Sequence, residues 1–190
     1  MSNRSDEFHW YHITQKGARN RPVFDKVKRR NVFVRAIAET DLEVHGFCVT
    51  PWRYHLLVWN TEAQVREGLL KLIGNFTGWF SALEGNRGPL LSAACEASPV
   101  EEDLAIQLLA EIHYLPVEHG LLDGDGYYEW SSYPAYIGTA ECPPWLVVER
   151  MNPHVPRPSS IPPGAGEDEF DSFGSVSVQI GFEDSTLSVL

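Results

Sequence analysis

The pattern of apolar and polar residues predicts strands and helices along the first 120 residues. Short segments rich in aromatic and β-branched residues predict strands over residues 9–15, 43–49 and 51–60. Apolar residues at helical spacing predict helices over about residues 24–40, 61–83 and 98–115. Thr61 is a suitable N-cap for the second of these helices. Ser98, Pro99 and Glu101 fit a capping box with proline in the first turn of the third helix.

The order of these elements predicts the fold class. Strand, helix, strand, strand, helix, helix is typical of an α+β sandwich of ferredoxin-like type, in which an antiparallel sheet carries helices on one face. The composition changes after Trp145, because residues 151–166 hold five prolines and residues 167–171 read EDEFD. We therefore predict one domain over residues 1–150 and a Pro-rich linker with a flexible acidic tail over residues 151–190.

The net charge of −11 is unevenly distributed along the chain. Residues 1–30 hold eight Lys and Arg against three acidic residues, a local charge of +5, so residues 31–190 carry −16. Broad nonspecific binding to nucleic acid is disfavoured, because that binding comes from neutralising phosphates. A local basic patch stays open as a nucleic-acid site. Its candidate residues are Lys16, Arg19, Arg21, Lys26, Lys28, Arg29 and Arg30.

Cysteine usage and hydropathy predict a cytoplasmic protein. The three cysteines are an odd number without CxxC spacing, which predicts neither a disulfide framework nor a thiolate zinc site. No run of about 18 apolar residues is present, so no membrane partner is expected. The first residues, MSNRSDEFHWYH, lack the apolar core of a secretory signal.

One predicted strand carries an unusual pair of side chains. Residues 50–58 read TPWRYHLLV, which is apolar except for Arg53 and His55. Because side chains alternate along a strand, these two residues share one face. A cationic and a titratable group at the same place on a buried strand indicate a functional site.

Four segments, taken in order, resemble the REP-associated tyrosine transposases, relatives of the single-tyrosine HUH transposases of the insertion-sequence 200 type. Residues 11–24 (YHITQKGARNRPVF) resemble the family's first strand and Arg-Asn loop, and residues 45–58 (HGFCVTPWRYHLLV) resemble its metal-binding strand. Residues 115–122 (LPVEHGLL) resemble the helix end usually written NPVRAGLV, and residues 128–138 (YEWSSYPAYIG) resemble the WSSY motif. The resemblance spans roughly residues 9–140.

The resemblance implies a ferredoxin-like core, recognition of single-stranded DNA, often as hairpins, and DNA cleavage by a tyrosine. In the family, two histidines on one strand hold Mg²⁺ or Mn²⁺. A phenol with a pKa near 10 is a poor nucleophile at neutral pH unless it is activated. The metal polarises the scissile phosphate and holds it in line.

This chain departs from the family at the positions that carry the chemistry. Arg53 replaces the first histidine of the pair, and only His55 remains. Glu111 stands at the position of the nucleophilic tyrosine, while Tyr114 lies three residues on, about 300° round a helix. Residues 88–97 hold no Lys or Arg where the family has a basic segment. We therefore expect a catalytically inactive chain without metal or cofactor, with Tyr114 as the fallback nucleophile.

Two hypotheses describe Arg53 at this degenerate site. Arg53 forms an ion pair with Glu111 where the metal and the tyrosine would have met, or it binds a phosphate bidentately without supplying Lewis-acid catalysis. The plainer alternative is that both side chains point to solvent. His55 is expected to be a buried, hydrogen-bonded histidine rather than a ligand.

The C-terminal region offers a separate hypothesis. Residues 175–182, SVSVQIGF, place apolar side chains on one face of a predicted strand. Such a strand can add to a sheet edge of this chain or of a protein partner, as in β-augmentation. The residues of this partner-docking strand are Val176, Val178, Ile180 and Phe182.

Three functions follow, in order of preference. The first is a catalytically inactive, transposase-derived protein that binds structured single-stranded nucleic acid such as DNA hairpins, as a regulatory or accessory subunit. The second is a protein–protein module that joins a larger complex through its acidic tail. The third is a residual single-strand DNA transposase or nuclease.

Overall fold

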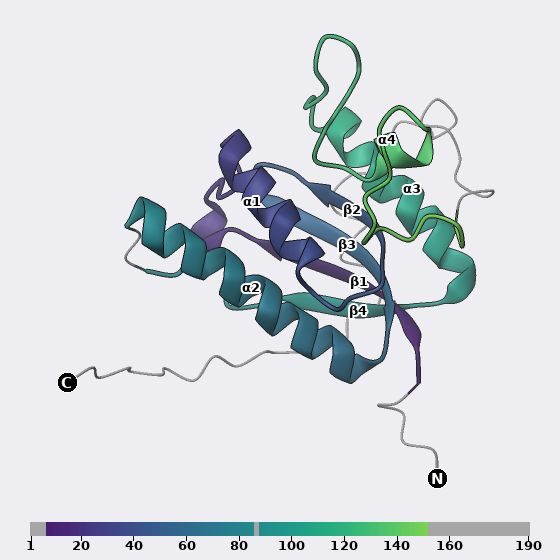
Figure 1. Ribbon diagram of the computed structural model, residues 1–190, viewed down its shortest axis with the longest axis horizontal. Coiled ribbons are helices and arrows are strands. Elements are labelled where there is room, and N and C mark those ends of the chain that lie inside the picture. The colour runs from purple at the N-terminus through teal and green to yellow at the C-terminus, as the bar shows by residue number, and fades with distance from the viewer. Residues whose placement is uncertain (1–6, 86–87, 152–190) are drawn as a thin grey trace.

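A computed structural model describes residues 7–85 and 88–151, which form a four-stranded sheet covered by helices (Figure 1). All neighbouring strands are antiparallel, and their order across the sheet is β2-β3-β1-β4. The strands are β1 (His9–Lys16), β2 (Val44–Val49), β3 (Arg53–Asn60) and β4 (Glu96–Val100). With the intervening helices this is the β-α-β-β-α-β arrangement of ferredoxin-like folds, so the predicted α+β class is confirmed.

Two helices cover one face of the sheet, as predicted. They are α1 (Val27–Ala38) and α2 (Glu62–Glu84), and they pack on the alternate residues Ile13, Tyr54 and Leu56 of the central strands. Thr61 caps α2 as predicted, and it does so within a capping box: its side chain accepts from the Gln64 amide, and the Gln64 side chain accepts from the Thr61 amide.

A third helix, α3 (Glu102–Glu118), lies on the opposite face, so the expectation that helices occupy one face only is corrected. Trp10 and Leu57 point to this face and form a second core with Leu109 of α3. The helix approaches the sheet closely at Gly46, where an added Cβ would lie 2.2 Å from the Leu109 side chain. The strand pattern is apolar on both faces because each face is covered.

The predicted start of the third helix is wrong by four residues. Ser98 and Pro99 belong to β4, where they pair with His12 and Tyr11 of β1, and the helix begins at Glu102 with Glu101 as its N-cap residue. Proline is tolerated there because β4 is an edge strand. The helix also continues past Leu115 and contains Pro116 before it ends at Glu118.

The segment that carries the WSSY motif closes the edge of the sheet at β2. The Ser132 hydroxyl accepts from the Phe47 amide, the Ser132 amide donates to the Phe47 carbonyl, and the Tyr136 hydroxyl donates to the His45 carbonyl. A short helix, α4 (Tyr133–Tyr136), follows. None of the described helices is long and apolar enough to span a bilayer. The predicted linker, acidic tail and docking strand after Met151 lie outside the described residues.

Candidate functional site

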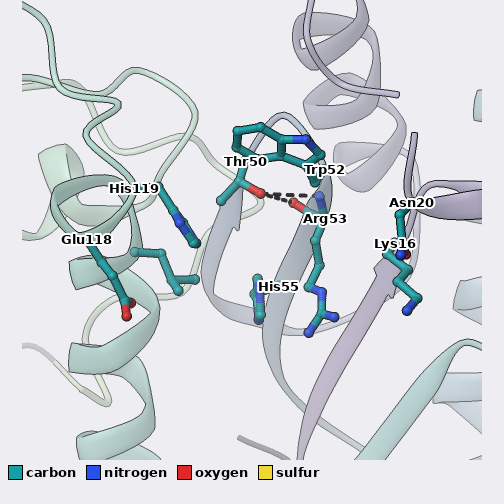
Figure 2. A pocket seen from close by; sticks show the side chains of 9 residues that line it. Lys16, Asn20, Thr50, Trp52, Arg53, His55, Glu118 and His119 are labelled. Carbon is teal, nitrogen blue, oxygen red and sulfur yellow. Dashed lines mark hydrogen bonds between the residues drawn. The ribbon is translucent and has the colours of Figure 1, made fainter. Parts of the chain in front are cut away.

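A cleft of about 460 Å³ lies where the paired strands β1 and β3 meet the C-terminal end of α3 (Figure 2). Polar and charged side chains converge on it from three parts of the chain that are far apart in sequence. Its lining residues are Lys16, Asn20, Thr50, Trp52, Arg53, His55, Leu115, Glu118 and His119.

Arg53 is held in the cleft by the turn between β2 and β3. The Thr50 hydroxyl accepts from the Arg53 amide at 3.2 Å, and both the amide and the hydroxyl of Thr50 donate to the Arg53 carbonyl at 2.9 Å. Arg53 is the direct register partner of Lys16 on β1, so the two cations face the cleft side by side (Figure 2). Among the described residues, neither cation has a carboxylate within 4.0 Å.

A strained loop forms the cleft wall beside Lys16. Arg19 and Asn20 both have positive φ, 57° and 54°, which non-glycine residues seldom adopt. Backbone hydrogen bonds hold the loop in place, from the Gly17 amide to the Trp52 carbonyl and from the Ala18 amide to the Leu90 carbonyl. The loop places the exposed Asn20 in the lining of the cleft, with the exposed Arg19 next to it in the chain.

Replacing Gly17 with alanine tests how far the cleft depends on this loop. An added Cβ would lie 2.0 Å from the Arg21 carbonyl oxygen, so the backbone must move. We expect a loss of about 1–3 kcal/mol in the free energy of unfolding, measured by urea denaturation. Gly74→Ala is the matched control, because its Cβ meets nothing within 4 Å inside α2 and alanine favours a helix. Equal stability of the two variants would contradict the packing argument.

Two histidines stack where β1 pairs with β3, and one of them, His55, lines the cleft. His12 Nε2 lies 3.1 Å from His55 Nδ1, with the rings 5.3 Å apart and nearly parallel. Burial, with a smaller effect from Arg53, lowers the pKa of His12 to about 4. Burial, followed by His12, Arg53 and His119, lowers the pKa of His55 well below its ordinary value. Both rings are therefore neutral at pH 7, and their shared hydrogen bond needs only one proton.

The hypothesised ion pair between Arg53 and Glu111 is not formed in this structure. Glu111 accepts a hydrogen bond of 2.9 Å from Gln107 Nε2 on the same helix, and no described carboxylate lies within ion-pair distance of Arg53. Neither Glu111 nor Tyr114 is among the residues that line the cleft. Arg53 instead presents its guanidinium to the cleft, which favours the phosphate-clamp hypothesis.

Most basic residues of α1 are engaged inside the domain. Arg29 pairs with Asp25 and Glu84, and Lys26 lies 3.9 Å from Glu84. Arg30 is buried, donates to the Phe24 carbonyl and stacks over Trp130, while Lys28 lies over Trp79. Arg21 donates to the Pro89 carbonyl at the edge of the cleft loop. The predicted basic set therefore divides: Lys16 and Arg53 line the cleft, and Arg19 and Arg21 belong to the neighbouring loop.

Several cleft residues escape the sequence-based prediction. Trp52 is 47% exposed beside Arg53 although tryptophan is usually buried, and His119 lies across from it with ring centres 6.3 Å apart. His12 is assigned no role by its sequence position alone. Two features of the sequence could have pointed to them. His12 lies on the same face of β1 as Lys16, and Trp52 directly precedes Arg53 in the turn.

The described residues offer no cluster of three or more His, Cys, Asp or Glu side chains able to hold a metal ion. The imidazoles of His12 and His55 are neutral, and the charged group next to them is the guanidinium of Arg53. The fold and the site together define a class: an antiparallel α+β domain of ferredoxin-like topology with a cationic, aromatic cleft at the strand ends.

Comparison with known proteins identifies a distant structural relative. No protein-family model matches the sequence, and no curated protein matches it. Among solved structures the chain is similar to a REP-associated tyrosine transposase bound to a REP hairpin, with a TM-score of 0.52 and 13% identity. The match covers 75% of this chain and 89% of that chain. At this identity the likeness establishes a shared fold.

Proposed function

We propose that this chain binds a nucleic-acid hairpin or another structured single strand through the cleft, and does not cut it. The observation that carries the proposal is that Lys16 and Arg53, which lie opposite each other on β1 and β3, line one cleft beside the exposed Trp52. Cations that follow a phosphate backbone, next to an aromatic ring on which a base stacks, are the recurring components of single-strand binding sites. The fold shared with a transposase solved on a REP hairpin supports the same proposal.

Each group has a distinct part in this binding. The Arg53 guanidinium donates to two phosphate oxygens at once, and Lys16 adds a point charge to the same or the next phosphate. Trp52 offers one face of its ring to an unpaired base. Because the chain as a whole is acidic, affinity comes from this local arrangement and not from the net charge.

The absence of cutting is argued from the residues at the two catalytic positions of the resembled family. Glu111 has no nucleophilic hydroxyl, and Tyr114 lies outside the cleft lining. Arg53 would repel a divalent cation placed beside His55, by roughly 4 kcal/mol per unit charge at about 4 Å and an effective dielectric of 20.

Incubation of the protein with a hairpin oligonucleotide in Mg²⁺ or Mn²⁺ tests this part of the proposal. We expect no covalent protein–DNA adduct on a denaturing gel and no shortened oligonucleotide. An adduct that disappears in the Tyr114→Phe variant would instead establish an active tyrosine nuclease.

Replacing Trp52 with alanine tests the stacking role. We expect hairpin binding to weaken by about 1–3 kcal/mol, roughly five- to 150-fold, in a fluorescence anisotropy titration. Phe8→Ala is the control, because Phe8 is similarly exposed, at 42%, but packs near Trp59 at the other end of the sheet. Equal losses in the two variants would show that Trp52 does not contact the nucleic acid.

A further inference from the structure

The acidic segment of residues 167–171, EDEFD, is the most concentrated negative charge in the chain, with four carboxylates around Phe170. It lies outside the described residues, so its sequence and its tether define where it can bind. We propose that this segment binds intramolecularly in the cleft, with its carboxylates at the phosphate positions, and competes with the nucleic acid. This inference rests on the proposed function, because it makes the tail a regulator of the same site.

Charge complementarity selects the cleft as the binding place. Residues 31–166 carry 7 Lys and Arg against 17 Asp and Glu, a charge of −10, so most of the domain repels the segment. Lys26, Arg29 and Arg35, at the start of α1 and along it, already pair with carboxylates. Lys16 and Arg53 line the cleft together and have no carboxylate partner within 4.0 Å among residues 7–85 and 88–151. An additional carboxylate can therefore neutralise two cations at one place.

The length of the tether matches the distance to be crossed. The described chain ends at Met151, just after Arg150, whose guanidinium lies 4.9 Å from the Trp59 ring and 5.7 Å from the Trp10 ring. Trp10 is six residues from Lys16 along β1, about 20 Å at the usual rise of a strand. Residues 152–166 would span about 20 Å as a flexible coil and about 45 Å if extended by their prolines. The tether therefore reaches the cleft at a high effective concentration.

The composition of the segment resembles that of the proposed ligand. Four carboxylates supply oxygen acceptors for Arg53 and Lys16, and a carboxylate accepts from a guanidinium in the same bidentate geometry as a phosphate. Phe170 supplies a ring in the midst of these charges, as a base does in a single strand, and Trp52 is an exposed ring next to the two cations. A segment of this kind occupies the cations and the stacking surface together.

Occupation of the cleft by the tail lowers the apparent affinity for nucleic acid. If the tail fills the cleft nine-tenths of the time, the hairpin binds about tenfold more weakly than to an open cleft. Because both ligands depend on the same charges, this competition is strongest at low ionic strength.

Two measurements on the full-length chain test the inference. In the first, hairpin affinity is measured at about 50 mM salt for Glu167→Gln/Asp168→Asn and for Glu183→Gln/Asp184→Asn, which remove the same charge from the same tail. We expect the first variant to bind about threefold more tightly than the second. Equal affinities would overturn the inference.

In the second, a carbodiimide joins carboxylates to amines that touch them, without any nucleic acid present. We expect monomeric protein to contain a cross-link between residues 167–171 and Lys16, which Lys16→Arg abolishes and added hairpin suppresses. Cross-links to other lysines but not to Lys16 would overturn the inference. If the Lys16 cross-link forms but no hairpin binds to any variant, the tail contact stands and the proposed nucleic-acid function fails.

Discussion

Replacing Arg53 with alanine should weaken hairpin binding about tenfold at moderate salt, more than any other single cation of the cleft. Arg53 is the first residue of β3, is fixed by the Thr50 turn and has no competing carboxylate partner among the described residues. Loss of one phosphate contact should also reduce the slope of log affinity against log salt by about 1. Both quantities come from anisotropy titrations over a range of salt concentrations.

Two further variants show whether the effect belongs to the clamp. Arg53→Lys keeps the charge but not the two parallel donors, so we expect intermediate affinity with an unchanged salt slope. Arg35→Ala is the control, because Arg35 is an exposed cation on α1, across the sheet from the cleft, and pairs with Glu39 at 3.3 Å. If Arg53→Ala and Arg35→Ala have the same affinity, Arg53 does not hold a phosphate.

Strands and helices whose own residues show a clear apolar pattern could be predicted from the sequence. The fourth strand, β4, could not. Thr61 and the spacing of apolar residues predict α2 to within one residue at each end. Ser98-Pro99-Val100-Glu101 has equally good local features for a helix start, yet Ser98 and Pro99 pair with β1. Their pairing depends on a strand more than 80 residues away, and this tertiary contact prevails over the local preference.

The site shows the same division between local and distant information. The alternation along β3 places Arg53 and His55 on one face, which the sequence reveals directly. The stacking of His12 on His55 depends on the register of β1 against β3, 43 residues apart, and the neutralisation of Arg29 depends on Glu84, 55 residues away. A sequence pattern shows which residues share a face of one strand or helix. It does not show which charged side chains find an ion-pair partner on a different strand or helix.

The protein should lose stability steeply below pH 6.5, because several buried histidines are neutral in the fold. Burial lowers the pKa of His12 to about 4 and that of His113 to about 3, and also lowers the pKa values of His45 and His55. In the unfolded chain these groups titrate near 6.5. The unfolded state therefore binds more protons below that pH, and stability falls as the pH falls, until the folded pKa values are reached.

The size of this effect follows from the number of groups. Each such histidine costs about 1.4 kcal/mol per pH unit once the pH is below its unfolded pKa. Four together give a slope of up to about 5 kcal/mol per unit, comparable with the whole stability of a small domain. Urea unfolding at about pH 7.5, 6.5 and 5.5 measures the slope above the range in which carboxylates titrate.

A variant that cannot titrate separates this cause from general acid sensitivity. His113 is 3% exposed, its Nε2 lies 2.7 Å from the Ser132 hydroxyl, and its Nδ1 has no hydrogen-bond partner in the described part of the chain. His113→Asn is expected to lower stability at pH 7.5 but to reduce the slope below pH 6.5 by about 1.4 kcal/mol per unit. If the slope is the same in His113→Asn and the parent chain, the fold does not hold His113 neutral. A purely structural loss lowers the free energy of unfolding by the same amount at every pH and leaves the slope unchanged.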